Sequence, residues 1–255
     1  MDYFAYTSGI RNWNSGFKVA LAVGSLVLCV AAKSPWIYLY VFLVMSYLTI
    51  GKGKLPIHEY LELYLIPAAF LIIGGLAIAV EIAANPVNEM NLRILGLYFF
   101  VTPESITKAV LVMLRALGAV SALYMMALST SAAELIQVMK YIHVPSLIIE
   151  LMHLIYRYVF VLMDTAMCMS QAAASRLGYT TKKRGFCTFG WIVSNLFLIS
   201  LKKANVYYDA MVSRGFDGTL NFWEEKKPLK RDLLVKGSIY LLTLFLLVVI
   251  TNVIG

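Results

Sequence analysis

The chain has 255 residues, of which 60% are hydrophobic and only 14% are charged, and its mean hydropathy is +0.76. A soluble domain usually carries about 25% charged residues, so this composition excludes a soluble enzyme, a disordered tail and a disulfide-rich secreted module. The net charge of +8 is explained more simply by basic cytoplasmic loops than by nucleic-acid binding. The composition therefore indicates a polytopic membrane protein.

Five stretches come close to the roughly 20 apolar helical residues that cross a bilayer. They are residues 17–32, 34–50, 63–80, 105–129 and 237–255. The fourth begins favourably at Thr102-Pro103-Glu104, because threonine can cap a helix, proline fits its first turn and glutamate suits its positive end. We expect the first stretch to be retained as a span and not removed as a signal sequence.

Two further apolar segments, residues 145–163 and 185–201, contain polar side chains. If both crossed the bilayer, the basic loop between them would lie outside, against the positive-inside rule. We therefore expect both to be helices that stay cytoplasmic or dip only partly into the membrane interface.

The distribution of charge orients the chain. Residues 165–232 contain 11 Lys and Arg against 5 Asp and Glu, whereas the linker 81–104 has three Glu against one Arg. The positive-inside rule thus puts the N-terminus and residues 131–232 in the cytoplasm and the linker outside. The predicted fold is an all-α integral membrane protein with about four spans in residues 1–130, a cytoplasmic block in 131–232 and a last span in 233–255.

The cytoplasmic block is too long for a plain connector, and its pattern predicts three amphipathic helices. The first begins at the capping box Ser131-Ala-Ala-Glu134 and ends before Pro145. The second covers about 145–177 and the third about 187–213.

The second of these helices carries a polar stripe. At 100° per residue, six polar side chains share a sector about 60° wide: Ser146, Glu150, His153, Arg157, Asp164 and Gln171. The stripe could stay wet at a membrane interface, line a polar crevice, or let Glu150 pair with Arg157 through His153.

Arg115 is the one charged residue in the interior of a predicted span; Lys18 and Lys108 lie near the starts of theirs. It could sit against Glu150 or a helix end, snorkel outward or touch substrate. Together with part of the polar stripe it forms a candidate structural polar network: Arg115, Glu150, His153, Arg157 and Asp164.

The two long cytoplasmic helices end alike. The second ends in Ser175-Arg176-Leu177-Gly178 and the third in Ser213-Arg214-Gly215-Phe216-Asp217-Gly218. A glycine can supply a left-handed C-cap, and an arginine suits the negative end of the helix dipole. That structural explanation suffices for one terminus, but two such tips favour docking, because a guanidinium can bind a partner carboxylate through two hydrogen bonds.

Paired Ala-Arg-Gly-type motifs at the ends of two cytoplasmic helices resemble the transmembrane T component of energy-coupling factor transporters. Three stretches are most similar to its cobalt branch, the CbiQ family: ELMHLIYRYVFVLMDTA (150–166), SRLGY (175–179) and SRGFDG (213–218). The resemblance covers about residues 100–220. Serine replaces alanine at 175 and 213, and Leu177 separates Arg176 from Gly178, which puts the cap geometry at Gly178 in question.

The resemblance implies a non-catalytic coupling subunit of an ABC importer in the inner (plasma) membrane of a prokaryote. Its partners would be a dimer of cytoplasmic ATPases, which hold ATP and magnesium, and a small membrane subunit, which binds cobalt; this chain would hold no cofactor. The residues implied in ATPase coupling are Ser175, Arg176, Gly178, Ser213, Arg214, Gly215 and Gly218. ATP binding would draw the two helix tips together, and the helices would carry that motion to the substrate subunit. Nickel or a vitamin is the alternative substrate.

A membrane enzyme and a stand-alone secondary transporter are the rival functions. An enzyme needs convergent acids or histidines, yet His58-Glu59-Tyr60-Leu61-Glu62 is not HExxH and Gly51-Lys52-Gly53-Lys54 lacks the P-loop frame. The three cysteines and three histidines show no metal-ligand spacing, so no metal site is predicted. A secondary transporter would favour broken helices in symmetric halves, and no such repeat is seen.

Overall fold

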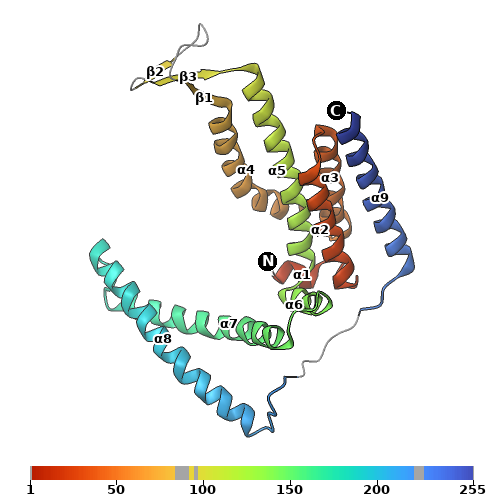
Figure 1. The fold of residues 1–255 in the computed structure, drawn as a ribbon. Coiled ribbons are helices and arrows are strands. Elements are labelled where there is room, and N and C mark those ends of the chain that lie inside the picture. The colour runs from red at the N-terminus through yellow and green to blue at the C-terminus, as the bar shows by residue number, and fades with distance from the viewer. Residues whose placement is uncertain (1, 84–91, 95–96, 221–226, 255) are drawn as a thin grey trace. The chain divides into compact units, whose positions relative to one another are not determined.

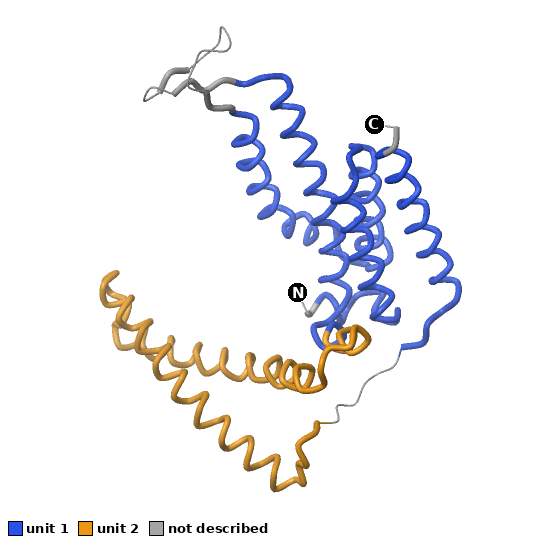
Figure 2. Tube along the Cα trace, in the orientation of Figure 1, with its two compact units in different colours: residues 1–135, 226–255 blue, residues 136–225 orange. Residues whose placement is uncertain are grey.

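The computed structural model describes residues 2–83, 92–94, 97–220 and 227–254. These residues form two compact units, one made of residues 1–135 with 226–255 and the other of residues 136–225 (Figure 2). We call them unit 1 and unit 2.

Most of the described chain is helical (Figure 1). Unit 1 contains α1 (Asp2–Thr7), α2 (Ser15–Ala31), α3 (Pro35–Tyr47), a π-helical turn η1 (Leu48–Lys52), α4 (Ile57–Ala79), α5 (Pro103–Ser129) and α9 (Arg231–Ile254). Helix α6 (Ala132–Tyr141) begins in unit 1 and ends in unit 2, which also holds α7 (Ser146–Ser175) and α8 (Lys182–Val212).

A small antiparallel sheet connects α4 to α5, where the sequence predicted only a linker. Its strands are β1 (Val80–Ala83), β2 (Leu92–Ile94) and β3 (Leu97–Val101), in the order β1-β3-β2. Residues 84–91 and 95–96 of the linker lie outside the described residues.

Helix α5 begins as its sequence predicts. The Thr102 side chain accepts a hydrogen bond from the backbone N–H of Ser105, and the Ser105 hydroxyl accepts one from the Thr102 backbone. With Pro103 in the first turn, this capping box satisfies amide groups that the helix itself leaves unpaired.

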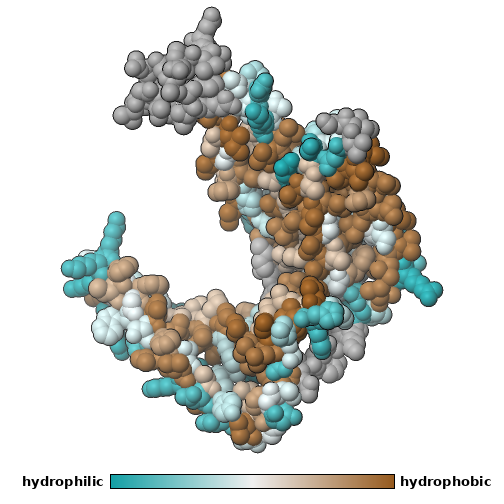
Figure 3. All heavy atoms as spheres, in the orientation of Figure 1, coloured by the Kyte–Doolittle hydropathy of each residue, from teal (hydrophilic) through white to brown (hydrophobic). Residues whose placement is uncertain are grey.

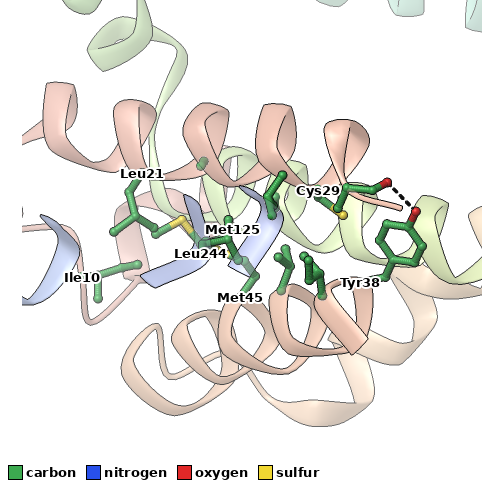
Figure 4. Packing of buried hydrophobic residues seen from close by; sticks show 13 residues of the cluster. Ile10, Leu21, Cys29, Tyr38, Met45, Met125 and Leu244 are labelled. Atoms are coloured by element: carbon green, nitrogen blue, oxygen red, sulfur yellow. Dashed lines mark hydrogen bonds between the residues drawn. The ribbon is translucent and has the colours of Figure 1, made fainter. Parts of the chain in front are cut away.

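The core of unit 1 lies where α2, α3, α5 and α9 meet (Figure 4). Its buried side chains include Leu21, Cys29, Tyr38, Met45, Met125 and Leu244. At Gly118 of α5, an added Cβ would lie 2.8 Å from the Cys29 sulfur and 3.0 Å from the Tyr38 carbonyl oxygen. The glycine therefore allows the backbones of α5 and α3 to approach closely, as small residues do between membrane helices.

The exterior of unit 1 is strongly apolar (Figure 3). On α4, Ile66 is 80% exposed and Phe70 is 75% exposed. A surface of this kind needs an apolar solvent, and a lipid bilayer supplies one.

Five helices are long and apolar enough to cross a membrane: α4, α5, α7, α8 and α9. This confirms a helical multi-pass membrane protein with about five candidate spans. The five helices are, however, not all the ones that the sequence predicted as spans. Helices α4, α5 and α9 correspond to three predicted spans, whereas α2 has only 17 residues and α3 only 13 before η1 continues it.

Helices α7 and α8 belong to the block that the sequence places in the cytoplasm. Length and composition make both of them candidate spans, and neither property says on which side of a membrane a helix lies. Their cytoplasmic location, and the domain boundaries at residues 130 and 233, stay predictions.

Candidate functional site

Helices α7 and α8 pack against each other in unit 2, joined by residues 176–181. The rings of Tyr158 and Tyr207 stack with centroids 4.6 Å apart and planes 5° from parallel. Near the connecting turn, the Thr188 hydroxyl donates to the Gly178 carbonyl oxygen at 2.9 Å. These contacts hold the two helix ends that carry the predicted docking arginines.

The end of α7 is a Schellman motif. The backbone N–H of Leu177 donates to Ala174 O at 3.0 Å, and that of Gly178 donates to Ala173 O at 2.8 Å. Leu177 takes the left-handed conformation, with φ +58°. The sequence offered Gly178 as the left-handed cap and left its geometry in question; the left-handed residue is Leu177, because the turn closes one residue earlier.

Gly178 has a different purpose at this end. A Cβ there would lie 2.8 Å from the Ala173 carbonyl oxygen and 3.0 Å from the Thr188 hydroxyl oxygen. The missing side chain thus lets the chain pass closely between the end of α7 and the first turns of α8.

The end of α8 repeats the motif with glycine in the left-handed position. Gly215 has φ +82°, its N–H donates to Val212 O at 3.0 Å, and the Phe216 N–H donates to Met211 O at 3.1 Å. Gly215 therefore has the role that its sequence predicts.

The two ends match residue for residue. Arg176 and Arg214 each directly precede the left-handed residue. Ser175 and Ser213 each donate their hydroxyl to the carbonyl oxygen three residues earlier, at 2.9 Å and 3.0 Å. Leu177 takes the left-handed conformation that Gly215 takes at the other end. Both arginines therefore stand at the same position of the same motif.

Arg176 and Arg214 are both exposed. Among the residues that the structure describes, neither has a hydrogen bond or an ion pair with another side chain. Arg176 caps α7 just before the turn to α8, and Arg214 follows the other end of α8, whose 31 residues span about 45 Å. The site therefore consists of two equivalent, well-separated cationic tips.

The loop after the second tip is held by Asp217. Its carboxylate accepts hydrogen bonds from the Thr219 backbone N–H at 3.2 Å and the Thr219 hydroxyl at 3.0 Å. These bonds stabilise the charged form and hold the pKa of the Asp217 carboxyl below its ordinary value. Gly218, with φ +98°, takes a backbone conformation that side-chain-bearing residues rarely adopt.

The polar stripe of α7 is not one hydrogen-bonded network in the part of the chain that the structure describes. The Glu150 carboxylate accepts from the backbone N–H of Leu220 at 3.2 Å and forms no ion pair with Arg157. The His153 Nδ1 lies 3.0 Å from the Ile149 carbonyl oxygen, while Arg157 and Asp164 are exposed. Glu150 thereby tethers the segment that follows the second tip.

Arg115 lies in unit 1, and of the predicted alternatives it takes the contact with a helix end. It donates to the Ala32 carbonyl oxygen, at the C-terminus of α2, at 3.1 Å, and to the Tyr38 hydroxyl at 2.8 Å and 3.0 Å. The Tyr38 hydroxyl in turn donates to Ala32 O at 2.6 Å (Figure 4). The cation thus neutralises the negative end of α2.

A second cluster, which the sequence did not predict, surrounds Glu134. Its backbone N–H lies 3.4 Å from the Ser131 hydroxyl oxygen, as in a capping box, but its carboxylate is bound by two lysines instead of completing the box. Lys18 Nζ lies 2.8 Å away and Lys227 Nζ 2.5 Å away. Lys18 is fully buried and also donates to Ser129 O at 2.6 Å.

This Glu134 cluster lies at the two points where the chain leaves and re-enters unit 1. Glu134 precedes the exit at residue 135, and Lys227 follows the return at residue 226. Lys227 makes two further hydrogen bonds. Its Nζ donates to the Arg11 carbonyl oxygen at 2.6 Å, and its own carbonyl oxygen accepts from the Asn14 side-chain amide at 3.1 Å. Lys18, at the start of the predicted span 17–32, was the sequence signal for this cluster.

Within the described ranges, no three His, Cys, Asp or Glu side chains lie close enough together to hold a metal ion.

The chain is similar to known transport proteins over most of its length. The model of the CbiQ family, described as cobalt transport protein, matches residues 7–227. A putative fused cobalt transport protein CbiMQ of Methanocorpusculum labreanum is 28% identical over 89% of this chain, which corresponds to 38% of that longer protein. Cobalt transport protein CbiQ of Rhodobacter capsulatus is 24% identical over 86% of this chain and 85% of its own length. An uncharacterized protein of Methanocaldococcus jannaschii, MJ1089, is 29% identical over 86% of this chain and 81% of its own length.

Proposed function

Because this chain belongs to the CbiQ family of cobalt transport proteins, we propose that it is the membrane subunit that couples ATP hydrolysis in cytoplasmic partners to cobalt import. The family match confirms the resemblance that the sequence motifs suggested and extends it to residues 7–227. The coupling role is supported by one observation above all: Arg176 and Arg214 stand at the same position of two matching helix ends.

The geometry of the tips suits docking. Each arginine extends from a helix end closed by two backbone hydrogen bonds, so little backbone freedom remains to be lost when a partner binds. Two equivalent cations separated by the length of α8, about 45 Å, suit a partner that presents the same acidic groove twice, as a dimer of ATPases would. ATP hydrolysis then belongs to that dimer, and this chain is not an enzyme.

The substrate ion is assigned to a second membrane subunit. The name of the fused relative from M. labreanum joins a CbiM part to a CbiQ part in one chain, which supports a direct partnership of this kind. We place the cobalt ligands in that partner, with nickel or a vitamin as the alternative substrate. This chain would transmit movement between the two partners through α7 and α8.

Affinity purification of the tagged full chain from its native membrane tests the proposal. We expect an ABC ATPase and a small membrane subunit to co-purify in fixed ratio. Arg176→Ala with Arg214→Ala should release the ATPase while leaving membrane insertion intact. Arg184→Ala, an exposed arginine in the first turn of α8, is the matched control and should retain the ATPase.

Either of two results would contradict the coupling role. The first is full assembly and transport by the double arginine variant. The second is a chain that purifies alone and moves substrate alone in vesicles, which would favour a secondary transporter and reduce the arginines to helix caps.

A further inference from the structure

An open crevice of about 440 Å³ in unit 1 lies between the segment after α1, the turn η1 and the start of α9. Three lysines line it: Lys52, Lys54 and Lys230. Asp232 is the only acidic residue among the described residues that line it, which leaves the crevice with a net charge of +2.

These lysines differ from the other lysines of the unit that lie near acidic groups. Lys18 and Lys227 each form an ion pair with Glu134. In the described part of the chain, Lys54 and Lys230 have no ion pair, and Lys52 has only the ring of Trp13, whose centroid lies 5.7 Å from its Nζ. The crevice therefore presents cationic charge that its own walls do not neutralise.

The backbone holds these cations in place at some conformational cost. The N–H of Gly9 donates to Gly53 O at 3.0 Å, and a Cβ on Gly9 would lie 2.5 Å from the Lys52 carbonyl oxygen. Lys54 has φ +57°, a left-handed conformation that favours glycine or asparagine. A lysine kept at such a position is better explained by its charge than by its backbone.

The crevice also lies at the level where helices end. The turn η1 terminates the helix begun by α3, and α9 starts at Arg231, the residue after Lys230. Tryptophan and lysine side chains at helix ends are characteristic of the membrane–water interface. A ligand at this level would have an anionic group in the crevice and apolar chains along the exposed helices.

We propose that this crevice binds the phosphate headgroup of an anionic membrane lipid. The three ammonium groups would surround the phosphodiester, and Trp13 would lie at the depth of the glycerol region. This site is independent of the coupling role proposed above, because it uses no residue of α7 or α8.

The test uses the full chain in nanodiscs of phosphatidylcholine with and without phosphatidylglycerol, and native mass spectrometry counts the lipids retained. We expect selective retention of phosphatidylglycerol by the unmodified chain. Lys52→Gln/Lys54→Gln/Lys230→Gln should lower that affinity by about 10- to 100-fold, since each of the three lysines near an anionic surface strengthens binding by a factor of several. Lys33→Gln/Lys108→Gln/Lys202→Gln removes the same charge from exposed sites elsewhere and should retain the lipid.

A further variant separates charge from folding. Lys54→Gly suits the left-handed backbone, so it should keep the thermal midpoint in phosphatidylcholine while weakening lipid retention. Equal retention by the crevice and control variants, or no preference for phosphatidylglycerol, would overturn the proposal. Equal competition by soluble glycerophosphate would also overturn it, because the site would then bind free phosphate esters and not lipid.

Discussion

Lys227 and Glu134 lie 93 positions apart in the sequence, and their side chains form an ion pair at the base of α6. The same carboxylate binds Lys18, whose side chain is fully buried. One carboxylate therefore pairs with two ammonium groups and ties the start of α6 and the segment before α9 to α2. Both places where the chain passes between unit 1 and residues 136–225 therefore lie next to this cluster in the sequence.

Replacing Glu134 should destabilise the protein strongly. Glu134→Gln leaves the buried Lys18 ammonium without a counter-charge, and breaking a buried ion pair in this way typically costs about 3–5 kcal/mol. The thermal midpoint of the purified chain in detergent measures the loss.

The double variant Lys18→Met/Glu134→Gln should recover part of this loss, because it removes the fully buried ammonium and leaves only Lys227, whose side chain is 10% exposed, without its carboxylate partner. Glu62→Gln is the matched control, since its pair with His58 is exposed on both sides and should contribute little. A destabilisation by Glu134→Gln no larger than that of the control would show that the cluster has no structural role.

The two helix tips should respond oppositely to changes at their left-handed residues. Gly215→Ala forces a side chain into φ +82° and should destabilise the end of α8 by about 1 kcal/mol. Leu177→Gly relieves the same strain at α7 and should leave that end as stable or up to about 1 kcal/mol more stable. Hydrogen exchange of the last turn of each helix reports both effects.

Each tip variant keeps its arginine, so ATPase retention provides a second measurement. Retention of the ATPase should depend on how well ordered the helix end is. It should be lower for Gly215→Ala and unchanged for Leu177→Gly. Protection that falls in both variants would mean that the two ends do not share one cap geometry.

Removing Arg115 should weaken the packing of α2 against α3 and α5. Arg115→Met loses the hydrogen bonds to Ala32 O and the Tyr38 hydroxyl, and hydrogen bonds from a charged donor are typically worth about 1.5–3 kcal/mol each. Arg115→Lys keeps the charge but not the planar fork that reaches both acceptors, so it should restore only part of the stability. Full stability of Arg115→Met, measured by thermal unfolding, would contradict this role.

The loop at Asp217 should be insensitive to pH across the neutral range and lose order in acid. The folded state lowers the pKa of this carboxyl, so its stabilising effect is present above the usual aspartate pKa of about 3.9 and disappears as the pH falls through the folded value. The protection factor of the Thr219 amide against hydrogen exchange should therefore fall below about pH 4 in the unmodified chain. Asp217→Asn should abolish that pH dependence, and an unaltered acid response in this variant would assign it to another group.

Local sequence patterns predicted the local structure of this protein well. The cap at Thr102, the apolar runs of α4, α5 and α9 and the glycine at 215 are determined by a few neighbouring residues, so spacing and residue type were sufficient. Leu177 shows the limit of that reasoning. A single inserted residue moved the left-handed position away from the glycine, and steric preference alone would not have chosen a leucine.

Contacts between distant residues could not be predicted. Glu134 matches a capping box in sequence, yet its carboxylate binds Lys18, 116 positions away, and no periodicity marks such a pair. The antiparallel strands β1 and β3 likewise depend on pairing across a connection. The apolar lengths of α7 and α8 fit either a cytoplasmic or a spanning helix, since hydropathy measures composition and not location.

The natural cysteines allow the location of α7 and α8 to be tested directly. Cys187 lies in the first turns of α8 and is exposed, as is Cys168 on α7, whereas Cys29 is buried in unit 1. If residues 131–232 are cytoplasmic, a membrane-impermeant maleimide should label Cys187 of the Cys168→Ser variant in inside-out vesicles and not in intact cells. The doubly substituted Cys168→Ser/Cys187→Ser variant retains only Cys29 and should stay unlabelled in both preparations, which excludes background from the buried thiol. Labelling of Cys187 in intact cells would place the 176–181 turn outside, make both helices membrane spans, and remove Arg176 from the reach of any cytoplasmic ATPase.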